Sequence, residues 1–300
     1  MHTTGGVQQS HFVDLAKDLS LVNRRLYQQG REYFIKKITI TDRDNEGYLQ
    51  VSTAPSGWTV HQGWKQARRL WHQMREGHGG APGSGLPTTM TPAKWADFKV
   101  YLSDAHRTAP TVPRPVDNAG NLVSIANSEW NHSTFTSPDA TTGADSFEVH
   151  LLGDHVGPAG ALTSVGIVQA YEESRRTVQL DDTGDEIDVD SPWINLFDDG
   201  TTLDQIASSL RLEGDSPPYD LEAYPGGATN MPAPLVQGLV AIAPYSTPGG
   251  TAPSVVLGGF SAPCGLLELQ TQSSEDGNTM SVIIELAQGD YKGIKAPSME

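Results

Sequence analysis

The sequence has little cysteine and no long apolar run, and both shortages limit what the protein can be. Its 300 residues include a single cysteine, Cys264, which excludes an intrachain disulfide framework and a zinc site built on several cysteines. No apolar stretch approaches the roughly 18 residues that a membrane-spanning helix needs. The first ten residues contain neither basic side chains nor an apolar segment. We therefore expect no secretory signal and no membrane partner.

Short signatures of common enzyme classes are missing as well. The chain has no Gly-x-Ser-x-Gly elbow, no phosphate-binding loop and no His-Glu-x-x-His zinc motif. A catalytic triad is defined by geometry, so the sequence alone leaves one open. Cys264 follows a proline beside an apolar run, which favours a small buried side chain over a nucleophile. We expect a protein that is not an enzyme and that needs no cofactor.

Charge is unevenly distributed along the chain. The formal net charge is −16, yet residues 1–115 carry a net charge of +6 and residues 116–300 a net charge of −22. One interpretation of this asymmetry is that the two parts face different surroundings. The simpler interpretation is that the acidic residues form a solvated exterior. Glycine and proline number 31 and 20. Such abundance is typical of a loop-rich β protein.

The first 110 residues mix helical and strand patterns. Apolar residues recur every three or four positions over 11–29 and 59–76, which predicts two amphipathic helices. A third helix is expected to begin at Pro92. Residues 32–41 and 47–53 alternate between apolar and polar side chains across a polar link that contains glycine. This pattern predicts a β-hairpin.

After Pro110 the strong segments are short, β-branched and separated by Gly, Pro, Asp and Ser. Candidate strands cover residues 121–126, 146–152, 163–171, 175–180, 235–243, 254–260, 265–271 and 280–287. The last two flank Asp276-Gly277, a pair that favours a tight turn. One short helix is expected over 202–210.

Strands and helices do not alternate regularly, which disfavours a parallel α/β fold. We predict a mainly β chain, with a jelly-roll-like antiparallel β-sandwich and two or three helices in the N-terminal third. Residues 1–300 are expected to form one domain. Its 1–110 part mixes helices with the hairpin, and its 111–300 part is β-rich and acidic.

Two groups of side chains are candidate metal ligands. His150, Asp154 and His155 would suit zinc if they converge, although ordinary polar loop residues are the simpler interpretation. The acidic run after residue 180 offers the oxygen ligands that Ca²⁺ prefers, and its members are Asp181, Asp182, Asp185, Asp188 and Asp190. A solvated acidic loop is the simpler interpretation here too. The alternative is a Ca²⁺ site shared between subunits.

Basic side chains concentrated before residue 76 form a candidate nucleic-acid surface. They are Arg24, Arg25, Lys36, Lys37, Arg68, Arg69 and Arg75. Lysine and arginine neutralise phosphates without reading base sequence. Interleaved aromatic residues would stack on single-stranded bases, and these are Tyr27, Tyr33, Phe34, Trp64 and Trp71. Most of them also lie on predicted core stripes, so a purely structural role stays open.

Three segments together resemble a known family. They are LSLVNRRLYQQGREYFIKKITI (19–40), APSGWTVHQGWKQARRLWHQM (54–74) and SVIIELAQGDYKGIKAPSM (281–299). In this order they resemble capsid proteins of small circular single-stranded DNA viruses known from environmental sequences. The resemblance implies a jelly-roll subunit that assembles with copies of itself into a small icosahedral shell around genomic DNA. It also implies assembly inside the host cell and a final location in the virion.

One feature departs from that family. Its members commonly begin with a disordered arm rich in arginine and lysine, whereas the first sixteen residues here contain neither. If the protein lines a genome, the later arginines and lysines must neutralise it.

Two further functions remain open. One is a non-enzymatic β-sandwich binding module of the carbohydrate or appendage type, with or without calcium, and its candidate residues are Trp130, Trp193, Tyr219 and Tyr224. The other is a hydrolase with paired carboxylates. Self-assembly separates the capsid hypothesis from both, because a binding module would stay small in solution.

Overall fold

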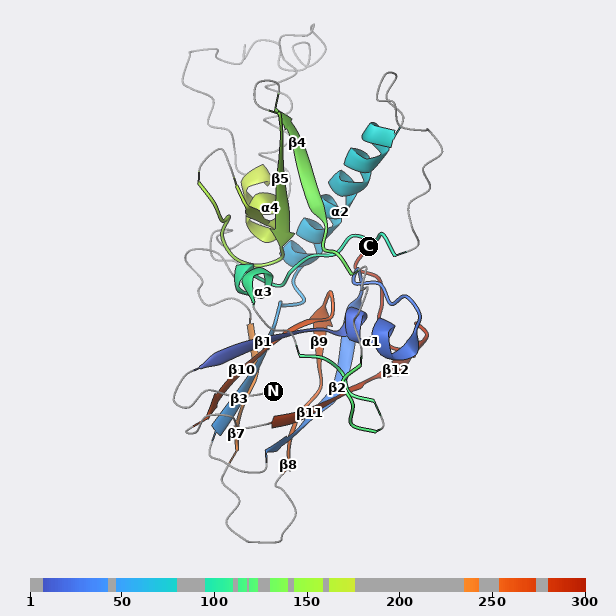
Figure 1. Ribbon diagram of the computed structural model, residues 1–300, viewed down its shortest axis with the longest axis vertical. Helices are drawn as coiled ribbons and strands as arrows, with labels where there is room; N and C mark the ends of the chain where they lie inside the picture. Colours follow the sequence, from blue (N-terminus) through green and yellow to red (C-terminus); the bar gives the residue numbers. More distant parts are fainter. Residues whose placement is uncertain are drawn as a thin grey trace, which may run out of the picture.

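A computed structural model describes eleven stretches of the chain. They are residues 8–42, 47–79, 95–109, 113–117, 119–123, 130–139, 143–158, 162–175, 235–242, 254–273 and 280–300. Helices and strands are mixed, and the sheets are mostly antiparallel. Figure 1 shows two sheets in its lower half and helices with a smaller sheet in its upper half.

The two lower sheets contain most of the strands. The first has the order β1 (Gln9–Asp14), β10 (Leu266–Ser273), β3 (Gly47–Thr53), β7 (Leu235–Ile242). The second has the order β11 (Met280–Leu286), β2 (Glu32–Asp42), β8 (Ser254–Leu257), and β2 also pairs with β9 (Phe260–Pro263). The strands predicted over 235–243, 265–271 and 280–287 are thereby confirmed.

The predicted strand 254–260 divides into β8 and β9. Gly258 and Gly259 separate the two, and β2 continues past the break. A Cβ atom on Gly259 would lie 2.7 Å from the backbone oxygen of Ile35. The backbone can approach β2 this closely only because glycine has no side chain.

Strand pairing in these sheets is nested. β1 pairs with β10, β2 pairs with β8 and β9, and β3 pairs with β7, all antiparallel. Consecutive members of this series alternate between the two sheets. In the first sheet, β10 also pairs antiparallel with β3, so it lies between β1 and β3.

The predicted hairpin does not form. Residues 32–41 and 47–53 are strands, but β2 belongs to the second sheet and β3 to the first. The strands on either side of Asp276-Gly277, β10 and β11, are likewise in different sheets. Alternating apolar residues identify the buried face of a strand but not its partner, so a hairpin and a crossing between sheets give the same pattern.

The predicted helix over 11–29 is wrong in its first part and too long. β1 occupies residues up to Asp14, and α1 (Leu15–Asn23) follows. Phe12 packs in one buried cluster and Val13 in another, so β1 is covered on both faces. A strand buried on both faces does not alternate, and its apolar residues can then match helical spacing. Arg24, with a left-handed φ of 51°, ends α1.

α2 (Trp58–Gly79) confirms the helix predicted over 59–76 and extends it. The helix expected from Pro92 is wrong for residues 95–103, which are not helical, and only the short α3 (Asp104–Thr108) follows. Phe98, Val100 and Leu102 are buried at alternate positions. Their segment is extended because it hydrogen-bonds to residues 149–152, with Leu152 N donating to the Leu102 oxygen over 2.9 Å.

A smaller sheet lies beside α2. β4 (Thr134–Asp139) pairs antiparallel with β5 (Gly143–His150), and β5 pairs parallel with β6 (Ser164–Gly166). Thus β5 confirms the strand predicted over 146–152 up to His150, whereas β4 was not predicted. The strand predicted over 163–171 is wrong beyond Gly166.

α4 (Ile167–Arg175) replaces the end of that predicted strand. It packs on α2 at Gly63, where a Cβ atom would lie 3.3 Å from Ile167. Of the predicted strand 121–126, the structure describes only 121–123, and Leu122 forms an isolated bridge with Val116. Residues 176–180 and 202–210 lie outside the described residues.

The chain ends in a short hairpin and a tail. β12 (Gln288–Gly289) pairs antiparallel with β13 (Gly293–Ile294). The tail then runs along the start of β2. Phe34 N donates to the Lys295 oxygen over 3.1 Å, and Met299 N donates to the Gly30 oxygen over 3.2 Å.

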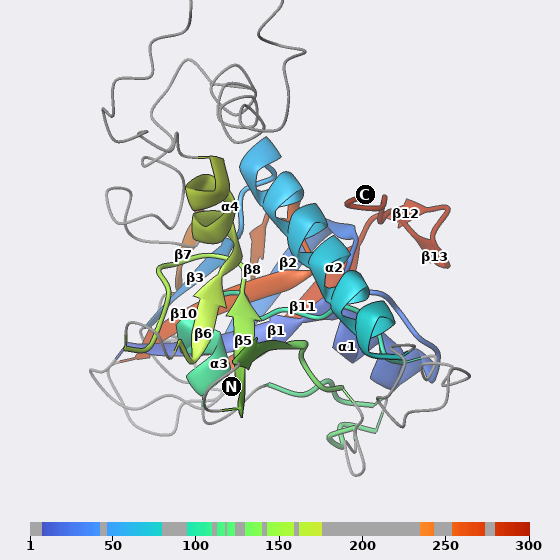
Figure 2. The ribbon, with the colours of Figure 1, turned by 90° about the horizontal axis from the view of Figure 1, so that it is seen from above.

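Two buried clusters fill the described part of the protein. One contains side chains of both lower sheets, including Ile38 and Ile40 from β2 and Leu267 and Leu269 from β10. The other joins α2, α4 and the 98–102 segment to the end of the first sheet. Figure 2 shows α2 crossing over the sheets.

A buried polar network connects the two clusters. Asp14 accepts hydrogen bonds from Lys17 N (3.1 Å), Gln29 Nε2 (3.0 Å) and Trp130 Nε1 (2.9 Å). The Gln29 amide also bonds both backbone groups of Val100, at 3.0 and 2.6 Å. Gln29 is fully buried, so water cannot replace these partners.

We predict that Gln29→Ala lowers the free energy of unfolding by about 3 kcal/mol, because it removes one of the three hydrogen bonds to Asp14 and both side-chain hydrogen bonds to the Val100 backbone groups. Gln28→Ala is the matched control, since the neighbouring side chain lies outside this network, and it should change stability by less than about 0.5 kcal/mol. Urea denaturation measures both. Equal losses in the two variants would contradict the network's role.

Candidate nucleic-acid interface

Three of the predicted nucleic-acid-facing residues have carboxylate partners, and two of them share one carboxylate. The ammonium groups of Lys36 and Lys37 lie 3.7 and 2.7 Å from the Glu285 carboxylate on β11. Arg68 on α2 forms an ion pair with Glu300. These cations are therefore weaker candidates for phosphate binding than the sequence suggested.

Other predicted cations are exposed. Arg24, Arg25 and Arg69 have exposed side chains, and none forms an ion pair with any carboxylate in the described stretches. The outer side of α2 also presents Lys65, and no acidic residue occurs between Trp58 and Arg75. Arg75 belongs to α2, but its side chain lies outside the described residues.

Two exposed lysines near the C-terminus were not among the predicted residues. Lys292 lies in the β12–β13 turn, and its ammonium group is 5.0 Å from the ring centroids of both Tyr27 and Tyr291. The ammonium group of Lys295 lies 4.0 Å from the centre of the Phe34 ring. The segment GDYKGI, which carries part of the family resemblance, was the one sequence signal that pointed here.

The β12–β13 turn docks on the turn that follows α1. Gln28 N donates to the Tyr291 hydroxyl over 3.1 Å, and Lys292 Nζ donates to the Leu26 oxygen. The rings of Tyr27 and Tyr291 meet edge to face at 6.0 Å. Arg31 stacks 3.6 Å from the centre of the Tyr291 ring. These contacts bring cations from both ends of the chain together.

The three segments that carry the family resemblance meet in space. Gly30, from the first segment, lies so close to Trp64 of the second that a Cβ atom would approach the indole to 2.5 Å. Met299, from the third, hydrogen-bonds to Gly30. The tail thus connects the cations beside α1 with those of α2.

Most of the predicted stacking residues belong to the core. Relative exposure is 4% for Tyr27, 0% for Tyr33, 1% for Trp64 and 7% for Trp71, so these rings cannot stack on bases. The structural alternative is therefore confirmed for them. Phe34, which lies under Lys295, is partly exposed.

The predicted zinc ligands do not converge. His150 is fully buried, and its ring nitrogens bond to Ser164 Oγ (2.7 Å) and the Asp154 oxygen (3.0 Å). His155 instead accepts from Gly166 N and contacts Glu173 at 3.1 Å. No group of three potential ligands occurs within the described ranges. The calcium candidates Asp181, Asp182, Asp185, Asp188 and Asp190 lie outside the described residues.

Residues considered for other functions have structural contacts or lie outside the described chain. Trp130 is half-buried and donates to Asp14, while Trp193, Tyr219 and Tyr224 are not described. Cys264 is fully buried 3.5 Å from the Met299 sulfur, and burial raises the pKa of its thiol well above the usual value. Among the described helices, none is long and apolar enough to cross a membrane.

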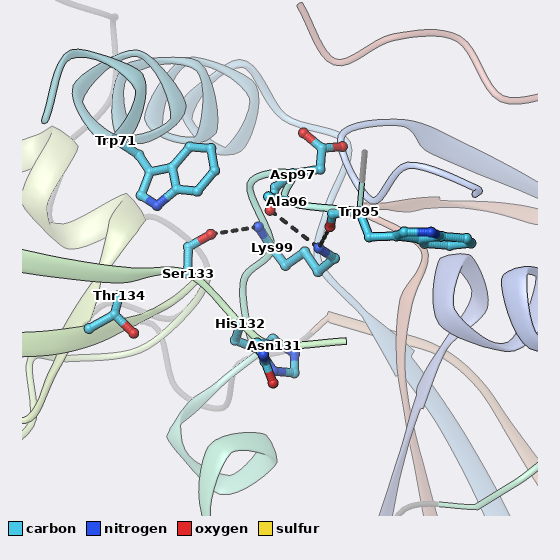
Figure 3. A pocket seen from close by; sticks show the side chains of 9 residues that line it. All are labelled: Trp71, Trp95, Ala96, Asp97, Lys99, Asn131, His132, Ser133 and Thr134. Carbon is cyan, nitrogen blue, oxygen red and sulfur yellow. Dashed lines mark hydrogen bonds between the residues drawn. The ribbon is translucent and has the colours of Figure 1, made fainter. Parts of the chain in front are cut away.

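A cavity of about 380 Å³ opens beside the 98–102 segment (Figure 3). Trp71 and Trp95 line it from different elements, together with Lys99 and His132. The ammonium group of Lys99 donates inward to the Trp95 oxygen over 2.6 Å. This lysine therefore holds the loop that lines the cavity.

Two histidines near the cavity are held neutral. Burial lowers the pKa of His106 to about 4. For His132, burial and the neighbouring charges lower the pKa to about 3. The His132 ring stacks on Tyr101 at 3.7 Å, and its Nε2 is buried without a hydrogen-bond partner.

Comparisons with protein-family models, with curated proteins and with solved structures find no match to this chain. Its function is therefore inferred from its own strand order, surface charge and contacts.

We predict that His132→Phe becomes increasingly more stable than the wild type as the pH falls below 6.5. The unfolded histidine takes up a proton near its ordinary pKa of 6.5, whereas the folded one stays neutral until about 3, so the wild type loses stability across this window. The difference should reach about 3 kcal/mol at pH 4. Urea unfolding at several pH values measures it, and a difference that does not change with pH would contradict the account.

Proposed function

We propose that this chain is a viral coat-protein subunit, which assembles with copies of itself into a closed shell around single-stranded DNA. The nested strand order carries the proposal. In a jelly roll, an antiparallel ribbon rolls up so that its first strand pairs with its last and the inner strands pair in turn. The pairs β1·β10, β2·β8/β9 and β3·β7 follow this scheme, and β11 adds an edge strand.

Packing supports a two-sheet sandwich of this kind. Side chains from both sheets share one buried cluster, as aligned sheets packed face to face do. The segment between β3 and β7 contains α2, α4 and the β4–β5–β6 sheet. We interpret these elements as an insertion at one end of the roll.

Jelly rolls also occur in lectins and cupins, so the fold alone does not select a function. Two observations favour the coat protein. The segments that resemble capsid proteins of small single-stranded DNA viruses pack on one another. The exposed cations Lys65, Arg69, Lys292 and Lys295 lie on these segments, where they can neutralise phosphates.

The outer face of the second sheet suits contact with another subunit. Ile283, Thr39 and Val256 lie in one row across β11, β2 and β8. Ile283 and Val256, on the two strands that flank β2, are 58% and 57% exposed, which is unusual for large apolar side chains in one row of a sheet. In the proposed shell a neighbouring copy of this chain covers the row.

Expression of the full chain tests the proposal. Size-exclusion chromatography should give an early peak with raised absorbance at 260 nm, and negative-stain images of that peak should show uniform closed particles. Nuclease treatment of intact particles should leave the enclosed nucleic acid in place. A 32.2 kDa monomer that persists across salt, pH and calcium conditions would contradict the proposal. A calcium-dependent rise in its melting temperature would favour a binding module instead.

A further inference from the structure

We infer that the two docked turns form a phosphate-binding clasp, made of Arg24, Arg25 and Lys292, for the backbone of a single-stranded nucleic acid. The inference rests on the proposed function and identifies the side chains of this chain that would hold the genome. It follows from where the three cations lie, from what neutralises them and from the backbone that presents them.

Both turns gather positive charge around one tyrosine. The Arg25 guanidinium lies 5.7 Å and the Lys292 ammonium 5.0 Å from the centre of the Tyr27 ring. Arg24 precedes Arg25 in the same turn and is exposed. The cations lie near each other because the Tyr291 hydroxyl and Lys292 Nζ fix the β12–β13 turn to residues 26–28.

No carboxylate in the described part of the chain forms an ion pair with these three side chains. Asp290 is exposed in the same turn as Lys292 and is the nearest acidic residue in sequence. By contrast, Lys36, Lys37 and Arg68 all have a glutamate partner. Grouped like charges raise the local potential, and an anionic ligand would relieve their repulsion.

The backbone supports the same inference. Within the described ranges, three residues other than glycine have a left-handed φ, and two of them are Arg24 at 51° and Lys292 at 53°. Glycine or asparagine adopts this conformation at lower cost. A cation therefore occupies the left-handed position of both turns, which fits a role for the charge itself.

The ligand is the phosphodiester backbone rather than the bases. Tyr27 is 4% exposed, so its ring offers no free stacking face, and the Arg31 guanidinium already covers one face of the Tyr291 ring at 3.6 Å. Lys292 uses one donor on the Leu26 oxygen, and an ammonium group has three. We therefore expect binding that does not depend on base sequence and that weakens steeply with salt.

The test uses a triple variant that removes the charges but keeps the turns. Arg24→Asn and Lys292→Asn retain a residue that tolerates left-handed φ, and Arg25→Gln retains length. The matched control is Lys36→Gln/Lys37→Gln/Arg68→Gln, which removes three cations that already have partners. Fluorescence anisotropy with labelled dT30 and dA30 measures affinity against salt concentration, and thermal melting checks folding.

The clasp variant should bind both oligonucleotides at least about tenfold more weakly at low salt. Its slope of log affinity against log salt should fall by about 2, since each lost phosphate contact on a single strand contributes about 0.7. The control should keep most of the wild-type slope. Equal losses in both variants would overturn the clasp and indicate diffuse electrostatic binding.

Particle formation separates this inference from the proposed function. Closed particles that contain nucleic acid, combined with an unchanged slope in the clasp variant, would refute the clasp and leave the coat-protein proposal standing. A wild-type chain that forms no particles and binds neither oligonucleotide would refute both.

Discussion

The buried Asp14 carboxylate connects parts of the chain that are far apart in sequence. It caps α1 through Lys17 N and accepts from Gln29 and Trp130, while Gln29 in turn holds Val100. Burial raises the pKa of Asp14, although its three hydrogen bonds oppose that shift. Burying a polar group without hydrogen-bond partners lowers the stability of the fold. The Asp14 carboxyl group is therefore tolerated in this position only when its hydrogen-bond partners are in place.

This network positions the candidate interface. Asp14 sets the point where β1 ends and α1 begins, and α1 then presents Arg24 and Arg25. Gln29 fixes the chain just before Gly30, where Trp64 and Met299 both pack. The tail can dock along β2 only when residues 28–31 have this course. The surface cations therefore depend on a buried hydrogen-bond network several residues away.

The spacing of apolar residues predicted many of the helices and strands. It did not predict which strands pair, because pairing depends on contacts between residues far apart in the sequence. α2, β2, β3 and the late strands follow from apolar spacing. The partner strands of β2 and β3 do not follow from this spacing, because alternating apolar residues identify the buried face of a strand but not the strand that pairs with it. For the proposed interface, the sequence analysis named Arg24 and Arg25 but not Lys292. It also included Lys36 and Arg68, whose glutamate partners lie more than 200 residues away.

The orientation of the subunit in an assembled particle tests the account most directly. A cryo-electron microscopy reconstruction that resolves the strands would show which side faces the interior. The account predicts that the α1–β2 turn and the β12–β13 turn line the lumen and contact density for nucleic acid. Particles with both turns on the outer surface, or with the turns buried between neighbouring subunits, would contradict it.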